Sequence, residues 1–425
     1  MNVRVFPAQL RGRAEPVITS KSQTHRALIC AALADDQTVL RRVALSGDIR
    51  ATRVCLEALG AEIRATGEDW IVFPIKQPRR GALLDCGESG ATLRFLLPVA
   101  AALGADGDFM VRGRLGERPL LPLYNAMAAH GVALSAPGVF PLACRGRLTP
   151  GDYRVAGDVS SQFVSGLLLA LPLLRGDSLV TVTGKMTSRP YVDMTREALR
   201  AFGVNVLEQD GVFCIPGGQR YISPGSLTLE GDWTAAACWL AAGAMSPAGV
   251  FCGPLKWASA QGDRVILDLL RRFGAETEEK ENGALVRGGA LRGIGIDAAD
   301  IPDLVPILAM VAAFAQGDTR ICSIDRLRYK ESDRVASVLA MLRALGAEAE
   351  AADDVLTIHG GAPLRGGRVD ACRDHRIVMA ASIAACACRG PVDILGAEAV
   401  SKSYPAFFSQ LAALGGQWEE IGDGI

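Results

Sequence analysis

The sequence predicts an α/β protein of two domains, each built from three copies of one βαβαββ unit. Three observations predict this fold: an amphipathic helix that stops at a glycine recurs, a strongly apolar helix alternates with it, and short strand patterns separate the two. The glycines that end the amphipathic helices lie 69 to 72 residues apart: Gly60, Gly131, Gly203, Gly274, Gly346 and Gly415. Such regular spacing over 425 residues indicates six copies of one folding unit.

Each of these glycines follows the last turn of a helix that has one apolar stripe. Before Gly346, for example, apolar residues fall at Val335, Val338, Leu342 and Leu345, which is helical spacing. A helix commonly finishes in a left-handed residue, a conformation that costs glycine nothing and clashes for most other residues. The glycine therefore marks where each amphipathic helix ends and a strand follows.

The other helix of each unit is rich in Ala and Leu and is apolar on all sides, so we expect it to be buried. The six stretches are Arg26–Ala34, Leu93–Leu103, Phe163–Leu174, Ala235–Met245, Leu304–Ala315 and Ile377–Cys388. After the glycines, alternating strand patterns around Asp210-Gly211 and Asn282-Gly283 predict hairpins.

The length of the unit bears on the domain organisation. Units of about 71 residues with buried helices favour closed domains over an open solenoid, whose repeats are usually shorter. A natural break falls near Pro224–Glu230, after the third unit. The fourth unit has no obvious first strand, so we expect Met1–Ile18 to complete the second domain. The predicted domains are residues 19–228, and residues 1–18 with 229–425, joined by two chain crossings that form a hinge.

Composition excludes several classes of protein. A net charge of −1 argues against general nucleic-acid binding, and the N-terminus does not resemble a signal peptide. The longest apolar runs, such as Leu167–Leu174 and Ile377–Cys388, fall short of the roughly 18 residues that a membrane span needs. The 11 cysteines show no pairing pattern, and four separate histidines argue against a metal site. We therefore expect a cytoplasmic protein with reduced thiols and no metal.

Cations recur where the predicted helices begin, although the positive end of a helix dipole disfavours a cation. They are Lys21, Arg26, Arg118, Arg334, Arg376 and Lys402. The Ser and Asp residues at helix starts can be explained as caps, but the cations cannot. If the helix N-termini converge, their N–H groups and these cations would bind several anions at once, so the substrates should carry phosphates and carboxylates. Asp303 and Glu331, which lie among the cations, are candidates for proton transfer.

Other polar residues near these starts leave alternatives open. His25 is more simply a packed or capping residue than a catalyst, whereas His375, between Asp374 and Arg376, fits either role. Glu88 could cap its helix or balance the charge of Arg94.

Five segments together resemble the 5-enolpyruvylshikimate-3-phosphate synthase family, and the resemblance spans the whole chain. The segments are Ser20-Lys21-Ser22 with Arg26, Gly157–Gln162, Lys330–Arg334, Asp374–Arg376 and Ser401–Pro405. The resemblance implies two inside-out α/β barrels of three units each, with buried parallel helices, that close around substrate at a two-stranded hinge. It also implies transfer of the enolpyruvyl group from phosphoenolpyruvate to the 5-hydroxyl of shikimate-3-phosphate, with release of phosphate.

The resemblance assigns roles to residues by their positions in the sequence. It implies that the first domain mainly binds shikimate-3-phosphate and that the second mainly binds phosphoenolpyruvate. Shikimate-3-phosphate would be held by Lys21, Ser22, Arg26, Ser160, Ser161, Gln162, Ser188, Tyr191, Asp303 and Lys330. Phosphoenolpyruvate would be held by Lys21, Gly90, Arg118, Gln162, Arg334, His375, Arg376 and Lys402. Glu331 would protonate the methylene carbon and Asp303 would take the hydroxyl proton, with Lys21 as a further acid/base. No cofactor is implied, and we expect a monomer.

Some positions depart from the better-known members of that family: Thr19, Glu88–Thr92, Arg326 and Arg373. Gly90 is retained, which predicts inhibition by glyphosate. One alternative is UDP-N-acetylglucosamine enolpyruvyl transferase, which typically has Lys-Asn and a loop cysteine, where this chain has Lys21-Ser22 and no cysteine in Leu115–Arg118. A second alternative, a non-catalytic repeat scaffold, would not need a lysine, two carboxylates and several arginines at helix starts.

Overall fold

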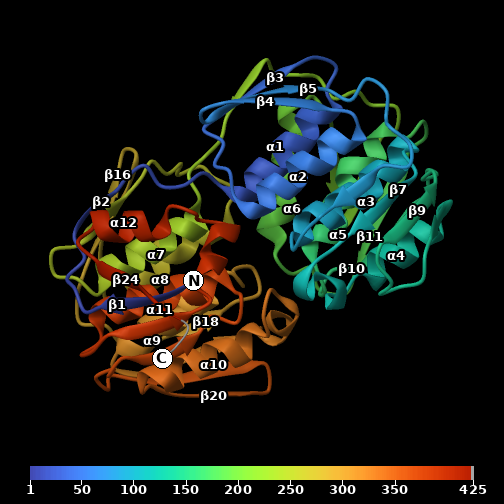
Figure 1. Ribbon diagram of the computed structural model, residues 1–425. Coiled ribbons are helices and arrows are strands. Elements are labelled where there is room, and N and C mark those ends of the chain that lie inside the picture. The colour runs from blue at the N-terminus through green and yellow to red at the C-terminus, as the bar shows by residue number, and fades with distance from the viewer. Residues whose placement is uncertain (423–425) are drawn as a thin grey trace. The chain divides into compact units, whose positions relative to one another are not determined.

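The computed structural model describes residues 1–422 and divides into two compact units (Figure 1). The middle unit is Lys21–Leu229, and the terminal unit combines Met1–Ser20 with Glu230–Ile425. Each unit has its own hydrophobic core. Both mix helices with strands, which confirms the predicted α/β class.

The middle unit alternates helices with short strands. Its helices are α1 (Lys21–Leu33), α2 (Gly47–Leu59), α3 (Gly90–Leu103), α4 (Leu121–Ala128), α5 (Ser161–Ala170) and α6 (Arg189–Ala201), with 3-10 turns η1 (Gly113–Glu117) and η2 (Leu171–Leu173). Its strands are β3 (Thr38–Arg41), β4 (Glu62–Thr66), β5 (Asp69–Phe73), β6 (Leu83–Asp85), β7 (Gly107–Met110), β8 (Val132–Leu134), β9 (Leu142–Gly146), β10 (Asp152–Ala156), β11 (Ser178–Thr183), β12 (Leu207–Gln209), β13 (Val212–Ile215) and β14 (Ser226–Thr228).

The terminal unit follows the same alternation. Its helices are α7 (Trp233–Ala244), α8 (Ile266–Phe273), α9 (Val305–Phe314), α10 (Arg334–Leu345), α11 (His375–Ala387) and α12 (Phe407–Ala413), with 3-10 turns η3 (Gly262–Val265), η4 (Asp325–Tyr329) and η5 (Ala397–Lys402). Its strands are β1 (Asn2–Phe6), β2 (Gly12–Ala14), β15 (Val250–Cys252), β16 (Glu276–Lys280), β17 (Gly283–Arg287), β18 (Gly295–Asp297), β19 (Gly317–Cys322), β20 (Glu348–Ala352), β21 (Val355–Gly360), β22 (Gly367–Asp370), β23 (Val392–Leu395) and β24 (Gln417–Ile421).

Within residues 1–422 the strands form six four-stranded sheets, three in each unit. The middle unit holds β14-β3-β5-β4, β6-β7-β9-β8 and β10-β11-β13-β12, and the terminal unit holds β2-β15-β17-β16, β18-β19-β21-β20 and β22-β23-β1-β24. Every sheet is paired in the same way: the first strand of each order is parallel to the second, and the remaining two pairs are antiparallel.

The N-terminal segment supplies strands to two sheets of the terminal unit. Strand β2 pairs in parallel with β15, and β1 lies between β23 and β24. Where the chain leaves the unit, Ser20 N donates a 2.8 Å hydrogen bond to Glu230 O, beside an antiparallel bridge between Thr19 and Gly231. The two points at which the chain leaves the terminal unit are therefore side by side.

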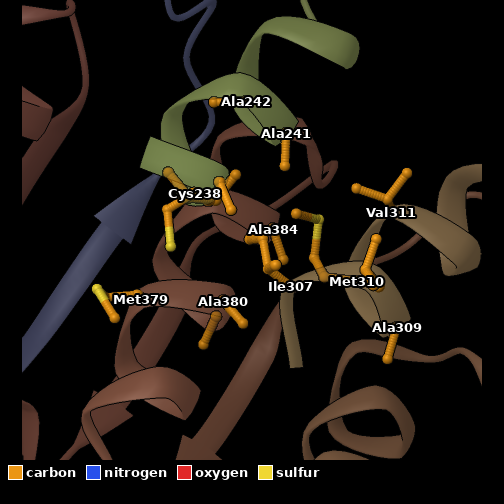
Figure 2. Close-up of a cluster of buried hydrophobic side chains, with 14 of the residues drawn as sticks. Cys238, Ala241, Ala242, Ile307, Ala309, Met310, Val311, Met379, Ala380 and Ala384 are labelled. Atoms are coloured by element: carbon orange, nitrogen blue, oxygen red, sulfur yellow. The ribbon is translucent and has the colours of Figure 1, made fainter. Parts of the chain in front are cut away.

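The apolar helices are buried, as their composition predicts. In α9 every residue from Val305 to Ala313 is buried, and in α7 every residue but Thr234 is buried. Figure 2 shows α7, α9 and α11 packing through small and flexible side chains such as Ala241, Met310 and Ala384. Alanine brings these helices close together, and methionine fills the irregular gaps between them. None of the helices in residues 1–422 is long and apolar enough to cross a membrane.

The glycine stops are confirmed for five helices, whose C-caps lie at or one residue before Gly60, Gly203, Gly274, Gly346 and Gly415, whereas Gly131 lies three residues after the end of α4. The φ angles of the six predicted glycines lie between 73° and 114°, the left-handed region in which a helix ends at no steric cost. The starts of two amphipathic helices were predicted wrongly. Arg118 lies outside α4, which begins at Leu121, and Lys402 ends η5, whereas α12 begins at Phe407. In both places a proline, Pro119 or Pro405, follows closely and disfavours helical geometry in the residue before it.

Candidate active site

Within the middle unit, hydrogen bonds connect the N-terminal ends of α1, α2, α3, α5 and α6. Lys21, the first residue of α1, donates a 2.8 Å hydrogen bond from Nζ to Oδ2 of Asp48 in the first turn of α2. Asp48 offsets the cost of a cation at the positive end of α1. The two side chains remain partly exposed, at 18% and 15%, so Lys21 is fixed in position and still accessible.

Arg26 is buried between α1 and α6. Its guanidinium donates to Oγ1 of Thr195 at 2.7 Å, to the carbonyl of Ser22 at 2.6 Å and to the carbonyl of Tyr191 at 2.7 Å. The Arg26 residue is only 2% exposed, and burial lowers its pKa to about 10. It therefore remains charged at neutral pH and fixes the backbone of two predicted substrate-binding residues.

A chain of buried hydrogen bonds crosses three helix starts. His25 Nδ1 lies 2.7 Å from Thr52 Oγ1, which lies 2.7 Å from Thr92 Oγ1, and Thr92 Oγ1 donates to Ser89 Oγ at 2.7 Å. Burial lowers the pKa of His25 to about 3, so its ring is neutral at physiological pH. This placement agrees with the interpretation of His25 as a packed residue. This series of hydrogen bonds fixes Ser89, which caps the helix that begins at Gly90.

Gly90 and Arg118 are in contact. A Cβ at Gly90 would lie 3.0 Å from Nη1 of Arg118, so the lack of a side chain lets the guanidinium lie over the start of α3. Arg94, one turn later, donates from Nη1 to Oε1 of Gln162 at 2.8 Å and from Nη2 to the carbonyl of Pro119 at 2.8 Å. Arg94 thus connects Gln162 to the segment that carries Arg118. The sequence analysis missed this role, because it considered Arg94 only as a charge that Glu88 could balance.

The remaining predicted residues of this unit lie at the starts of α5 and α6. Ser160 caps α5, and its hydroxyl accepts from the N–H of Gln162 at 3.3 Å. Ser188 precedes α6 in a left-handed conformation with φ 55° and ψ 39°. A left-handed residue other than glycine is uncommon and is concentrated at functional sites, where it directs a side chain that a regular helix start would not.

In the terminal unit, Arg334 organises three carboxylates. It is fully buried, and its Nε donates to Asp374 at 2.9 Å, its Nη1 to Asp303 at 2.9 Å and its Nη2 to Glu331 at 2.6 Å. Burial alone would favour the neutral form of Arg334, but the three carboxylates raise its pKa. The two carboxylates predicted to transfer protons are therefore fixed by one guanidinium, while 19% and 20% of their side-chain surface stays exposed.

Asp303 also lies close to two further cations that were predicted to bind substrate. Arg376 donates from Nη2 to Oδ2 of Asp303 at 2.6 Å, and Lys330 Nζ lies 3.7 Å from its Oδ1. Burial would raise the pKa of Asp303, but Arg376, Lys330 and Arg334 together hold it well below the ordinary value. Burial lowers the pKa of Lys330 to about 8, although Asp303 opposes this shift.

His375 and Lys402 occupy different positions around this cluster. His375 is buried, with Nδ1 3.9 Å from Oδ1 of Asp374. Lys402 Nζ donates to the carbonyl of Arg373 at 2.9 Å, in the turn before α11. Arg326, one of the residues that depart from the better-known family pattern, donates to the carbonyl of Ala299 and is thereby tied to the segment before α9.

Each unit therefore concentrates a different chemistry at its helix starts. The middle unit presents hydroxyls, an amide and Lys21, whereas the terminal unit presents carboxylates fixed by arginines. Helix N–H groups and cations suit anionic ligands, and ionised carboxylates suit proton transfer. No group of three His, Cys, Asp or Glu side chains that could hold a metal ion occurs in residues 1–422.

Comparisons of the whole chain with known proteins agree on one family. The model of the family described as EPSP synthase (3-phosphoshikimate 1-carboxyvinyltransferase) matches residues 7–411. The 3-phosphoshikimate 1-carboxyvinyltransferases of Clostridium kluyveri and Clostridium acetobutylicum are 42% and 40% identical to this chain, with 98% of each chain covered. Among solved structures, EPSP synthase from Acinetobacter baumannii aligns with a TM-score of 0.81 at 23% identity, covering 99% of this chain and 100% of that one. The enolpyruvyl transferase NikO from Streptomyces tendae aligns with a TM-score of 0.80 at 20% identity, covering 99% and 98%.

Proposed function

The chain belongs to the EPSP synthase family, and we infer that it transfers the enolpyruvyl group of phosphoenolpyruvate to the 5-hydroxyl of shikimate-3-phosphate. The observation that carries this conclusion is a family-model match over residues 7–411 together with 42% identity to a full-length relative of that activity. The reaction belongs to the shikimate pathway of aromatic amino-acid biosynthesis. The alternative acceptor, UDP-N-acetylglucosamine, is not favoured by these comparisons.

The finer architecture is part of the proposal. We propose that each unit is a domain in the form of an inside-out barrel, built from three βαβαββ repeats around buried helices, and that the two domains close at the paired chain crossings. The common pairing order of the sheets supports the repeats. The hydrogen bond between Ser20 and Glu230 supports the position of the hinge.

The side chains at the helix starts support different binding positions for the two substrates. Shikimate-3-phosphate suits the middle unit, where the hydroxyls of Ser22, Ser160, Ser161, Ser188 and Tyr191 and the amide of Gln162 can bind hydroxyls and phosphate. Phosphoenolpyruvate suits the cations Lys21, Arg118, Arg376 and Lys402, with Gly90 leaving room beside Arg118. Two phosphate groups of roughly −1.5 to −2 charge each account for this number of cations.

The contacts of two arginines that were expected to bind substrate support a positioning role instead. Arg26 and Arg334 are buried and donate to protein acceptors from all three of their nitrogens. We propose that Arg26 fixes Ser22 and Tyr191 for shikimate-3-phosphate, and that Arg334 orients Asp303 and Glu331. His375, buried beside Asp374, supports the same cluster.

In the proposed mechanism a proton adds to the methylene carbon of phosphoenolpyruvate, which leaves positive charge at the adjacent carbon. The 5-hydroxyl oxygen attacks that carbon and gives up its proton, forming a tetrahedral intermediate. Loss of phosphate and of one methyl proton then restores the carbon–carbon double bond and gives the enol ether product. Asp303 is ionised and can accept the hydroxyl proton, while Glu331 is the proposed acid toward carbon, with Lys21 as a further acid/base.

The test is phosphate release from phosphoenolpyruvate, offered shikimate-3-phosphate and UDP-N-acetylglucosamine in separate reactions. Release with shikimate-3-phosphate alone is the expected result. Release with UDP-N-acetylglucosamine alone would assign the alternative acceptor, and release with neither would overturn the enzymatic proposal. We further propose a cytoplasmic monomer, for which size-exclusion chromatography should give a mass near 44.8 kDa.

A further inference from the structure

The left-handed conformation of Ser188 has to be imposed by its neighbours. In this conformation the Cβ of a residue other than glycine crowds the backbone, so such a residue keeps it only where the surrounding structure holds it there. Only 5% of Ser188 is exposed, and its side chain does not cap α6. The residues on both sides of Ser188 are bound to other segments of the middle unit.

The residue before Ser188 is bound to the segment that precedes α5. Thr187 donates to the carbonyl of Gly157 twice, from its N–H at 3.1 Å and from its hydroxyl at 3.2 Å. The N–H of Gly157 in turn donates to the carbonyl of Thr183 at 2.9 Å. A Cβ at Gly157 would lie 3.0 Å from the Cα of Met186, so this close approach of two segments requires glycine. The chain is therefore fixed immediately before Ser188.

The residue after Ser188 forms a bidentate ion pair with the edge strand β12. Arg189, the first residue of α6, donates from Nη1 to Oε1 of Glu208 and from Nη2 to Oε2, both at 2.6 Å. Asp193, one turn later in α6, accepts from Nε of Arg189 at 3.1 Å and from Nη2 at 3.0 Å. The two carboxylates offset the cost of a cation at the positive end of α6. Two parallel hydrogen bonds also fix the orientation of the guanidinium, which a single contact does not.

A second ion pair attaches α6 to the same strand farther along the helix. Arg196, two turns after Arg189, donates from Nη1 to Oε2 of Glu208 at 2.9 Å. The side chain of Glu208 is 15% exposed and accepts from both arginines. Because Arg196 already connects the middle of α6 to β12, the pair between Arg189 and Glu208 is not needed for that connection. What it adds is a fixed position for the backbone next to Ser188.

We propose that Arg189 and Glu208 are positioning residues, whose ion pair holds Ser188 in its left-handed conformation and thereby orients its hydroxyl toward the ligand. Tyr191, on the same turn, is held separately, because its carbonyl accepts a 2.7 Å hydrogen bond from Arg26. The identity of the ligand as shikimate-3-phosphate rests on the proposed function. The effect of the ion pair on the backbone of Ser188 does not.

The first test measures the steady-state kinetics of Arg189→Met. Its KM for shikimate-3-phosphate should rise about ten-fold, the effect of weakening one hydrogen bond to a charged group. Its kcat and its KM for phosphoenolpyruvate should stay within about two-fold of the wild type, because the lost contact contributes to binding alone. Arg189→Lys keeps the charge without the bidentate geometry and should give an intermediate KM.

Arg196→Met is the matched control, because it also removes a cation from Glu208 but lies two turns away from Ser188. Its KM for shikimate-3-phosphate should stay within about two-fold of the wild type, as expected for a residue that only attaches the helix. A rise as large as that of Arg189→Met would mean that attachment of α6 to β12 explains the effect, and would overturn the proposal.

The second test asks whether Arg189 acts through Ser188. Ser188→Gly lacks the hydroxyl but adopts the left-handed conformation without strain, so its KM for shikimate-3-phosphate should also rise. If the ion pair acts by holding Ser188, adding Arg189→Met to Ser188→Gly should raise this KM by less than about two-fold further. Two effects that multiply in the double variant would indicate independent roles and would contradict the proposal.

A third measurement needs no substrate and therefore separates this proposal from the proposed function. The N–H of Tyr191 donates to the carbonyl of Ser188 at 3.1 Å, so its protection from hydrogen exchange reports on this turn. Hydrogen–deuterium exchange of residues 187–191 should be about ten-fold faster in Arg189→Met than in the wild type or in Arg196→Met. Exchange in the buried helix α5 should be the same in all three proteins, which shows that the variants are folded. Unchanged exchange at residues 187–191 would overturn the proposal even if the enzyme turns over as expected.

Discussion

Arg376 donates a 2.6 Å hydrogen bond from Nη2 to Oδ2 of Asp303, which lies 73 residues earlier in the chain. The pair joins the start of α11 to the segment before α9. Burial disfavours the charge on Asp303, but Arg376, Lys330 and Arg334 together hold its pKa well below the ordinary value. The carboxylate is therefore ionised over the whole pH range in which the enzyme is expected to work.

Replacing Asp303 with Asn should lower kcat by about 10²- to 10⁴-fold, because the variant can no longer accept the hydroxyl proton. Phosphate release at saturating concentrations of both substrates measures this loss. Asp325→Asn, at a carboxylate whose side chain is 69% exposed and lies just beyond the cluster, is the control and should retain activity. Full turnover by Asp303→Asn would remove Asp303 from the proton-transfer step.

The pH dependence of shikimate-3-phosphate binding should depend on Lys330. Burial lowers its pKa to about 8, so the ammonium loses its proton as the pH rises through 8. Loss of this positive charge should raise KM for shikimate-3-phosphate by up to about ten-fold per pH unit above pH 8. Steady-state kinetics from pH 6.5 to 9.5 measure this rise. Lys330→Arg stays charged throughout and should lack the rise, whereas equal slopes in both enzymes would contradict the prediction.

Arg26 should contribute strongly to the stability of the fold. Arg26→Met leaves the carbonyls of Ser22 and Tyr191 and the hydroxyl of Thr195 without their buried donor. We expect the free energy of unfolding to fall by about 3 kcal/mol, as for other buried charged hydrogen bonds. Urea denaturation measures the change. Arg200→Met, at an exposed residue near the end of α6, should change it by less than about 0.5 kcal/mol.

Inhibition by glyphosate should depend on the contact between Gly90 and Arg118. We expect the wild-type enzyme to be inhibited. A Cβ in Gly90→Ala would lie 3.0 Å from Nη1 of Arg118 and displace the guanidinium by a few tenths of an ångström. The inhibition constant should rise about ten-fold or more, the effect of weakening one hydrogen bond to a charged group. Phosphate-release assays over a range of glyphosate concentrations measure the inhibition constants of the wild-type enzyme and of Gly90→Ala. Gly295→Ala has open space around the new Cβ, and a rise of the same size in that variant would contradict the explanation.

Part of the candidate site could be predicted from sequence because the signal is local. Cations next to helix starts break a rule of local electrostatics, and Lys21, Arg334 and Arg376 stand out for that reason. The prediction was wrong for the surroundings of Arg118 and Lys402, because short 3-10 turns and prolines replace the expected helix starts. Composition and spacing do not distinguish those turns from a helical first turn.

Other residues give no local signal. Arg94 lies within an apolar helix, and its partners Gln162 and Pro119 are 68 and 25 residues away. Asp263 looks like an ordinary acid at the start of a helix, but it is buried because η3 packs against α7. Its pKa is raised mainly by this burial, and charges from the segment before α9 and from α11 also act on it. Such residues are identified only when the chain is folded, because their environment comes from distant elements.

The sequence by itself determined the α/β class, the burial of the apolar helices and the glycine that ends each amphipathic helix. These features follow from hydrophobic periodicity and backbone sterics, which act over a few residues. Only the tertiary structure decided which cations bind carboxylates, which are buried against backbone carbonyls, and which buried acid has a raised pKa. Those properties depend on desolvation and on charge separations of a few ångströms between residues far apart in the chain, and no local pattern records those distances.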